Sequence, residues 1–183
     1  MSMRKDAAKA MFDFVQGFND FCGANAGNET VWAFTEVRTE PQAGNVIANL
    51  AQCSIQFRDI SVEILNKLDE GVEQVCQQAA RANELEFSTE KTVTLAPTAI
   101  QEQIVTAIEL AANELEVSLR RMPSGAGHDA MVIGRYIPAG MLFIPSIGGL
   151  SHDTEENTSE EDIRRGAEVF AAAISKLIDK EMH

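Results

Sequence analysis

Residues 52–58 alternate strictly between apolar and polar side chains. The apolar set is Cys53, Ile55 and Phe57, and the polar set is Gln52, Ser54, Gln56 and Arg58. A period of two predicts a β-strand with one buried face and one solvated face. Such a strand needs a layer of helices over its apolar face, so the neighbouring segments should supply them.

The segments around this strand predict that layer. Helical periodicity runs through residues 6–21 and 65–79, while residues 31–37 and 86–95 are rich in the β-branched and aromatic residues typical of strands. The resulting order, helix, strand, strand, helix, strand, is that of a split βαββαβ unit without its opening strand. We therefore expect residues 1–96 to form a ferredoxin-like α+β domain, an antiparallel sheet with two helices, that begins one strand late.

Residues 97–183 have a different pattern. Capping boxes at 98–101 and 158–161 predict the starts of two helices, and a short strand is expected at 117–121. The continuous apolar run 141–145 is typical of a strand buried on both faces. With a helix starting near Asp129 between these two strands, the order is αβαβα and the chain as a whole is α/β, but its second half has too thin a core to stand alone. We expect it to be part of a larger domain.

Composition excludes several classes of partner. The net charge is −13 and no basic cluster exceeds two residues, so nucleic acid is not expected to bind. The cysteines at 22, 53 and 76 are odd in number and lie in periodic apolar segments, which predicts reduced core residues. No apolar run reaches the about 18 residues of a membrane span, and the charged start has no signal-peptide core. We expect a cytoplasmic protein that does not bind membranes.

Two of the three histidines, His128 and His152, lie in glycine-flanked loops. An imidazole is the commonest metal ligand and a usable acid or base near neutral pH. His152 follows the predicted strand at 141–145, and the carboxyl ends of such strands present residues to ligands. The structural alternatives are a turn into a helix starting near Asp129 for His128, and a surface position in an acidic loop for His152.

Asn45 and Arg58 form a second candidate pair. An asparagine offers amide donors, and an arginine offers a planar fork that matches a carboxylate with two hydrogen bonds. The structural alternative is a turn residue at Asn45 and a solvated edge charge at Arg58. Spacing alone favours this alternative.

Four segments, taken together and in order, resemble one family. They are Asn45-Val46-Ile47, Phe57-Arg58-Asp59, Pro123–Ala130 and Phe143–His152. They are similar to the N-carbamoyl-L-amino acid hydrolases, relatives of allantoate amidohydrolase and β-ureidopropionase within a wider group of metal-dependent amidohydrolases and aminopeptidases. Residues 1–7 also resemble the tail of the family's His-containing motif at the entry to its lid domain, so the resemblance spans essentially the whole chain.

The resemblance implies a role for each candidate residue. His152 corresponds to the last metal ligand of the family. Gly127 and His128 correspond to active-site residues that contact the substrate, and His128 is the candidate catalytic group of this chain. Asn45 and Arg58 correspond to lid residues that hold the substrate carboxylate.

The resemblance also implies a mechanism and an assembly. Family members use two divalent metal ions, zinc or manganese among others, bridged by a water that a glutamate deprotonates for attack on the carbamoyl or ureido carbon. The lid is also the dimerisation surface, and its residues reach the active site of a neighbouring subunit in some members. Residues 1–96 would then be the lid and residues 97–183 the C-terminal segment of the catalytic domain.

The family's other metal ligands and its glutamate base lie in an N-terminal half without a counterpart in this sequence. One imidazole is too few for a catalytic metal, which usually takes three or four protein ligands. We therefore expect a C-terminal fragment of a metal-dependent amidohydrolase, inactive alone and without a tightly bound metal, whose candidate partners are a second copy and an N-terminal catalytic segment. The alternative hypothesis is a non-catalytic dimerising or carboxylate-binding module that keeps Asn45 and Arg58.

Overall fold

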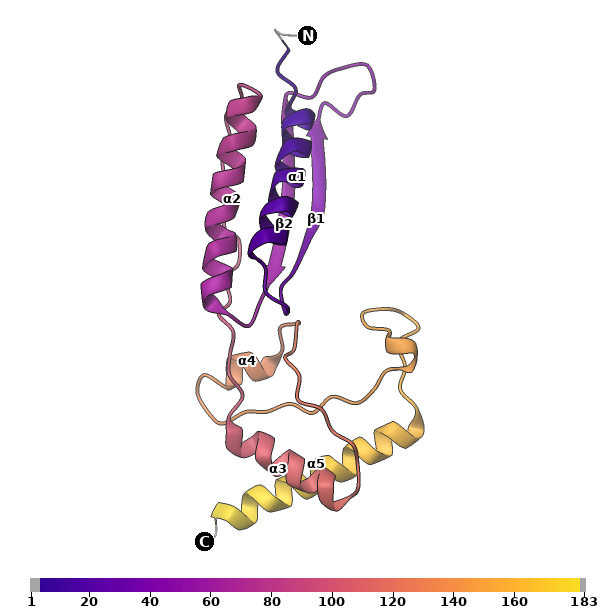
Figure 1. Cartoon of the computed structure of the whole chain (residues 1–183). Helices are drawn as coiled ribbons and strands as arrows, with labels where there is room; N and C mark the ends of the chain where they lie inside the picture. Colours follow the sequence, from indigo (N-terminus) through magenta and orange to yellow (C-terminus); the bar gives the residue numbers. More distant parts are fainter. Residues whose placement is uncertain (1–3, 182–183) are drawn as a thin grey trace. The chain divides into compact units, whose positions relative to one another are not determined.

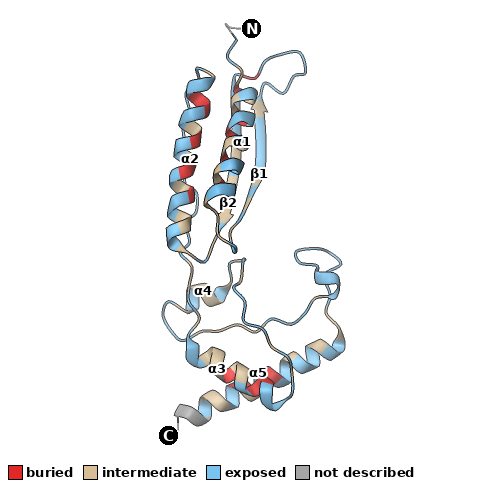
Figure 2. Ribbon diagram, in the orientation of Figure 1, coloured by how far each residue is buried: buried red, intermediate tan, exposed pale blue. Residues whose placement is uncertain are grey.

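The computed structural model describes residues 4–181, which divide into two compact units, one ending at Pro97 and the other beginning at Thr98. Each unit has its own cluster of buried side chains. Figure 2 shows these buried residues in red along the helices of each unit. The assignment of the units to a lid and to a catalytic segment stays a prediction.

The first unit is a β-hairpin covered by two helices (Figure 1). Its elements are α1 (Ala7–Asn25), β1 (Val31–Glu40), β2 (Leu50–Arg58) and α2 (Val62–Ala82). The strands pair antiparallel from Val31 opposite Arg58 to Glu40 opposite Leu50, with a bulge between Phe34 and Glu36. Within residues 4–181 these are the strands of a single two-stranded sheet.

Aromatic packing on α1 forms the core of the first unit. Phe18 is fully buried, with its ring centroid 5.9 Å from that of Phe14 and 6.2 Å from that of Phe34, which it meets edge to face. Phe57 adds a tilted ring at 6.3 Å. Burying one such side chain contributes about 1.5–3 kcal/mol. The apolar face predicted for residues 52–58 is confirmed, because it packs half-buried against this cluster.

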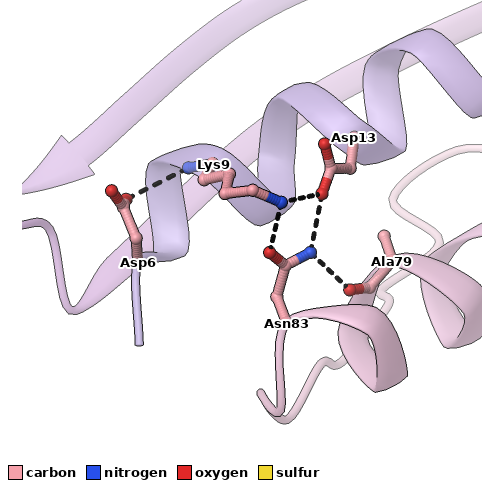
Figure 3. A network of polar contacts seen from close by, with 5 residues as sticks. All are labelled: Asp6, Lys9, Asp13, Ala79 and Asn83. Atoms are coloured by element: carbon pink, nitrogen blue, oxygen red, sulfur yellow. Dashed lines mark hydrogen bonds and ion pairs between the residues drawn. The ribbon is translucent and has the colours of Figure 1, made fainter. Parts of the chain in front are cut away.

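A polar network joins the start of α1 to the end of α2 (Figure 3). The Lys9 Nζ donates to Asp13 Oδ2 at 2.7 Å and to Asn83 Oδ1 at 2.8 Å. The amide of Asn83 donates in turn to Asp13 Oδ2 at 2.8 Å and to the Ala79 carbonyl at 2.9 Å. The hydrogen bond from Lys9 lowers the pKa of the Asp13 carboxyl below its usual value. The network fixes the α2 terminus beside α1 with one amide side chain.

The prediction of a strand at 86–95 is wrong. These residues form no strand, and Thr89 Oγ1 instead donates to Glu73 Oε1 of α2 at 2.6 Å, while Lys91 pairs with Asp69 of α2. A strand exists only as part of a ladder, because its N–H and C=O groups need a neighbouring backbone. The segment therefore lies along α2, held by its side chains.

The second unit is built on a pair of helices. Its elements are α3 (Glu102–Glu114), the short α4 (Asp129–Ile133), the 3₁₀ turn Ile147–Gly149 and α5 (Glu160–Glu181). Small side chains bring α3 and α5 together, with Ala111 and Ala112 of the one and Val169 and Ala173 of the other nearly fully buried. The helix expected near Asp129 is confirmed as α4.

The strands predicted at 117–121 and 141–145 are also wrong. Both segments are irregular, and Val117, Leu119 and Leu142 pack against the α3–α5 cluster. The apolar runs are thus covered by helices instead of by neighbouring strands. The fold class stands at the level of a mixed α/β chain with a small antiparallel sheet and two covering helices.

The capping box predicted at 98–101 is wrong, and the one predicted at 158–161 is displaced by one residue. The α3 helix begins at Glu102 with Gln101 as its N-cap and without a side-chain cap bond. At α5 the capping hydroxyl belongs to Ser159 and not to Thr158, since Ser159 Oγ accepts the Asp162 N–H at 3.1 Å. Position N3 is the partner in such a box, so a shift of one residue moves both members.

The cysteines are free thiols, as predicted, and burial raises the pKa of Cys22 to about 11. No helix in residues 4–181 has both the length and the apolar character to cross a bilayer.

Replacing Gly71 with alanine is expected to destabilise the first unit. A Cβ there would lie 2.2 Å from Phe21 Cε1, so the ring must move. Overpacking costs about 1–3 kcal/mol, against a gain of about 1 kcal/mol in helix propensity. Urea unfolding measures the difference. The matched control is Gly23→Ala on α1, where no atom lies within 4 Å and a gain in stability is expected; equal effects of the two changes would contradict the close packing.

Candidate functional site

His128 is held at the start of α4 by the glycine loop that precedes it. Its backbone is extended, with φ −134° and ψ 158°, and caps the helix, while its side chain is half-buried. The imidazole Nε2 lies 2.8 Å from Ser124 Oγ. The ring also contacts Phe143, at 5.4 Å between centroids and 60° between planes. The segments Pro123–Ala130 and Phe143–His152 therefore meet at this histidine.

His152 lies in an exposed acidic loop after the 3₁₀ turn. Its φ of +59° is in the left-handed region, which costs a residue with a side chain about 1–2 kcal/mol. The backbone N–H of His152 donates to Glu156 Oε2 at 2.8 Å, which holds this conformation. The ring Nδ1 lies 2.8 Å from Ser151 Oγ. This contact restrains the imidazole through Nδ1, and Nε2 faces away from Ser151.

The residues around His152 do not make a metal site by themselves. Within the part of the chain that the structure describes, no three His, Cys, Asp or Glu side chains group closely enough to hold an ion. A catalytic metal takes three or more protein ligands. His152 is thus a single imidazole with a restrained ring, and a metal bound there needs further ligands from elsewhere.

Asn45 and Arg58 lie at opposite ends of the hairpin. Asn45 is exposed in the turn between β1 and β2, while Arg58 is the last residue of β2. The nine residues of β2 span about 26 Å at ~3.3 Å per residue, so the two side chains do not meet in one chain. Arg58 Nη2 donates to Gln56 Oε1 at 3.3 Å on the solvated face of the strand, so that face is confirmed.

Sequence reasoning missed the two serines beside the histidines. Ser124 precedes His128 by four residues across a loop with two glycines, and Ser151 directly precedes His152. A hydroxyl near an imidazole in a loop has no periodic signal, so only the folded loop shows the contact.

The comparisons with known proteins define the family. A model of the peptidase family M20/M25/M40 matches residues 4–176, and the chain belongs to that family. It is 28% identical over 178 residues to the N-carbamoyl-L-amino-acid amidohydrolase of Pseudomonas sp. (strain NS671), covering 97% of this chain and 43% of the relative. It is 30% identical over 178 residues to a ureidoglycolate hydrolase of Oryza sativa, covering 97% and 37%. Further relatives are named allantoate amidohydrolase.

Solved structures agree with this family. The crystal structure of AtUAH in complex with glyoxylate superposes with a TM-score of 0.87 at 28% identity, over 97% of this chain and 42% of that one. A Bacillus subtilis protein described as a dinuclear metal binding peptidase from M20 family shares the fold, with a TM-score of 0.71 at 17% identity over 95% and 47%. The chain spans less than half the length of the relatives it matches.

Replacing His152 with glycine is expected to stabilise the second unit relative to replacement with alanine. Glycine adopts a φ of +59° without the steric cost that alanine keeps, so the Gly variant should be more stable by about 1 kcal/mol. Urea unfolding of both variants measures this. Glu116→Gly, at a φ of +54° beyond the end of α3, is the matched control and should also stabilise. Equal stability of His152→Gly and His152→Ala would mean that the loop does not hold this conformation.

Proposed function

We propose that this chain is the lid and C-terminal catalytic portion of a metal-dependent amidohydrolase that cleaves N-carbamoyl-L-amino acids or related ureido compounds. The supporting observation is the match of 97% of the chain to relatives that carry these activities in their names. Residues 1–96 are the proposed lid, and residues 97–183 carry His128 and His152. The reduced cysteines favour a cytoplasmic setting.

Exposed apolar residues on α5 support a larger assembly. Phe170, Ile174 and Ile178 are spaced by four residues and are 57%, 41% and 55% exposed, while Val169 and Ala173 are buried against α3. A helix that is apolar on more than one face is typical of the interior of a larger protein. This pattern is what a partial catalytic domain would have.

The proposed roles follow the chemistry of each side chain. The guanidinium of Arg58 binds the substrate carboxylate through two charge-assisted hydrogen bonds, and the amide of Asn45 donates to the same group. Gly127 lets the backbone approach the substrate closely beside His128. His128 contacts the reacting group through its imidazole, which serves as a donor or an acceptor according to its tautomer.

The separation of Asn45 and Arg58 supports a homodimer. The about 26 Å between the two ends of β2 exceeds the length of a small carbamoyl amino acid. If both residues hold one substrate, they come from two copies of the chain. The proposed dimer forms through the lid, whose two-stranded sheet has free backbone groups along its edges within the described residues.

The proposed metal chemistry needs ligands beyond this chain's described residues. His152 is the one ligand that we assign, with Nε2 as the coordinating atom because Nδ1 faces Ser151. Two divalent ions, zinc or manganese, would supply an activated water and stabilise the developing charge. The described residues of this chain do not complete this site.

Joining this chain to the N-terminal half of an N-carbamoyl-L-amino-acid amidohydrolase is expected to give metal-dependent release of ammonia from N-carbamoyl-L-amino acids. Chelation should abolish the release, and zinc or manganese should restore it. His152→Gln should lower the rate by at least about tenfold, since second-sphere losses alone reach that size. Asp153→Asn, in the same loop, is the control. A folded, metal-loaded hybrid without activity would rule out this function.

A binding measurement tests the alternative, a non-catalytic carboxylate-binding module. Calorimetry with an N-carbamoyl amino acid on the chain alone should then show binding that Arg58→Ala weakens about ten- to a hundredfold, as loss of charged hydrogen bonds does. Arg38→Ala on β1 is the matched control, because Arg38 pairs with Glu36 on an exposed strand. No binding by the folded chain removes this alternative.

Light scattering on the same samples tests the proposed dimer. A monomeric mass would contradict it.

A further inference from the structure

The hydroxyl of Ser124 lies at the centre of the loop that carries His128. Three polar atoms surround Ser124 Oγ: His128 Nε2 at 2.8 Å, the Ala126 N–H at 3.2 Å and the Ala126 carbonyl at 3.2 Å. All three residues are half-buried. One hydroxyl thus joins the backbone of the loop to the imidazole of His128.

The single proton of the Ser124 hydroxyl determines which of its three contacts it can donate to. A hydroxyl has one proton to give and two lone pairs to accept with. If Ser124 Oγ donates to the Ala126 carbonyl, its lone pairs accept from the Ala126 N–H and from His128 Nε2–H, and all three contacts are satisfied. If the hydroxyl donates to His128 Nε2 instead, the Ala126 carbonyl loses this donor. The loop therefore favours a proton on Nε2.

Two further contacts fix the imidazole. The carbonyl of His128 accepts the Met131 N–H at 2.9 Å in the first turn of α4, which holds the backbone. The ring of Phe143 lies 5.4 Å away and restricts rotation of the imidazole. The imidazole makes its hydrogen bond within the loop through Nε2, so in the Nε2–H tautomer Nδ1 carries the ring's lone pair.

We propose that Ser124 is a positioning residue that holds His128 as the Nε2–H tautomer and leaves Nδ1 as an acceptor for a substrate N–H. A carbamoyl or ureido group carries N–H donors, which an acceptor nitrogen matches and a second donor does not. The contact between Nδ1 and a substrate N–H rests on the proposed function. The tautomer itself follows from the loop alone.

Nitrogen-15 NMR of the histidine side chains tests the tautomer in the 183-residue chain. Spectra are recorded with rising pH until the shifts no longer change, because only the two nitrogens of a neutral ring, one protonated and one not, differ strongly in shift. We expect a protonated Nε2 and an unprotonated Nδ1 for His128, assigned by the loss of its signals in His128→Gln. A protonated Nδ1, or averaged shifts, would overturn the proposal.

Matched variants separate positioning from general stability. Ser124→Ala should move the His128 shifts toward averaged values, whereas Ser124→Thr keeps a hydroxyl and should retain the single tautomer. Ser151→Ala, which removes the hydroxyl beside His152, should leave the His128 shifts unchanged. If Ser124→Ala does not change these shifts, Ser124 does not set the tautomer.

A substrate readout distinguishes this proposal from the proposed function. In the hybrid enzyme, Ser124→Ala should weaken binding of an N-carbamoyl amino acid about two- to tenfold, the effect of one hydrogen bond, and Ser124→Thr should restore it. If the tautomer is fixed but neither Ser124 variant changes the binding of the N-carbamoyl amino acid, Ser124 positions His128 and the role assigned to His128 is wrong. If the tautomer is not fixed in a hybrid that is active, the positioning proposal fails and the function stands.

Discussion

Two helix pairs bury most of the described core, and the remaining segments are arranged around them. In the first unit, Phe18 of α1 packs between α2 and the hairpin, and the sheet contributes only its half-buried face. In the second unit, alanines on α3 and α5 allow close approach, and irregular segments fill the flanks. Because Arg58 ends the strand that packs on this first cluster and Leu142 precedes Phe143 on the second, helix packing positions the segments that carry or contact two of the candidate residues.

The helices and the hairpin could be predicted from sequence because their signals are local. A period of 3.6 marks α1, α2 and α5, and a period of two marks β2, and each pattern is complete within the element itself. The segments 86–95, 117–121 and 141–145 also have strand-like composition. A strand is a property of two segments, however, and composition does not reveal whether a partner backbone is present.

The candidate site was predicted in part for the same reason. Glycine-flanked histidines mark His128 and His152 as unusual, but the sequence does not show that Phe143 reaches His128 or that Glu156 binds the His152 backbone. Contacts across loops depend on backbone geometry, and periodicity carries no information about them.

The length of the hairpin determines the distance between Asn45 and Arg58. Its nine-residue β2 sets the separation between the turn that carries Asn45 and the end that carries Arg58. Adding a pair of residues to each strand would lengthen this separation by about 6.6 Å and keep every side chain on its face. Adding a single residue would turn the following side chains to the opposite face. Strand length in this unit can therefore change only in steps of two residues, and each step would move Asn45 and Arg58 further apart.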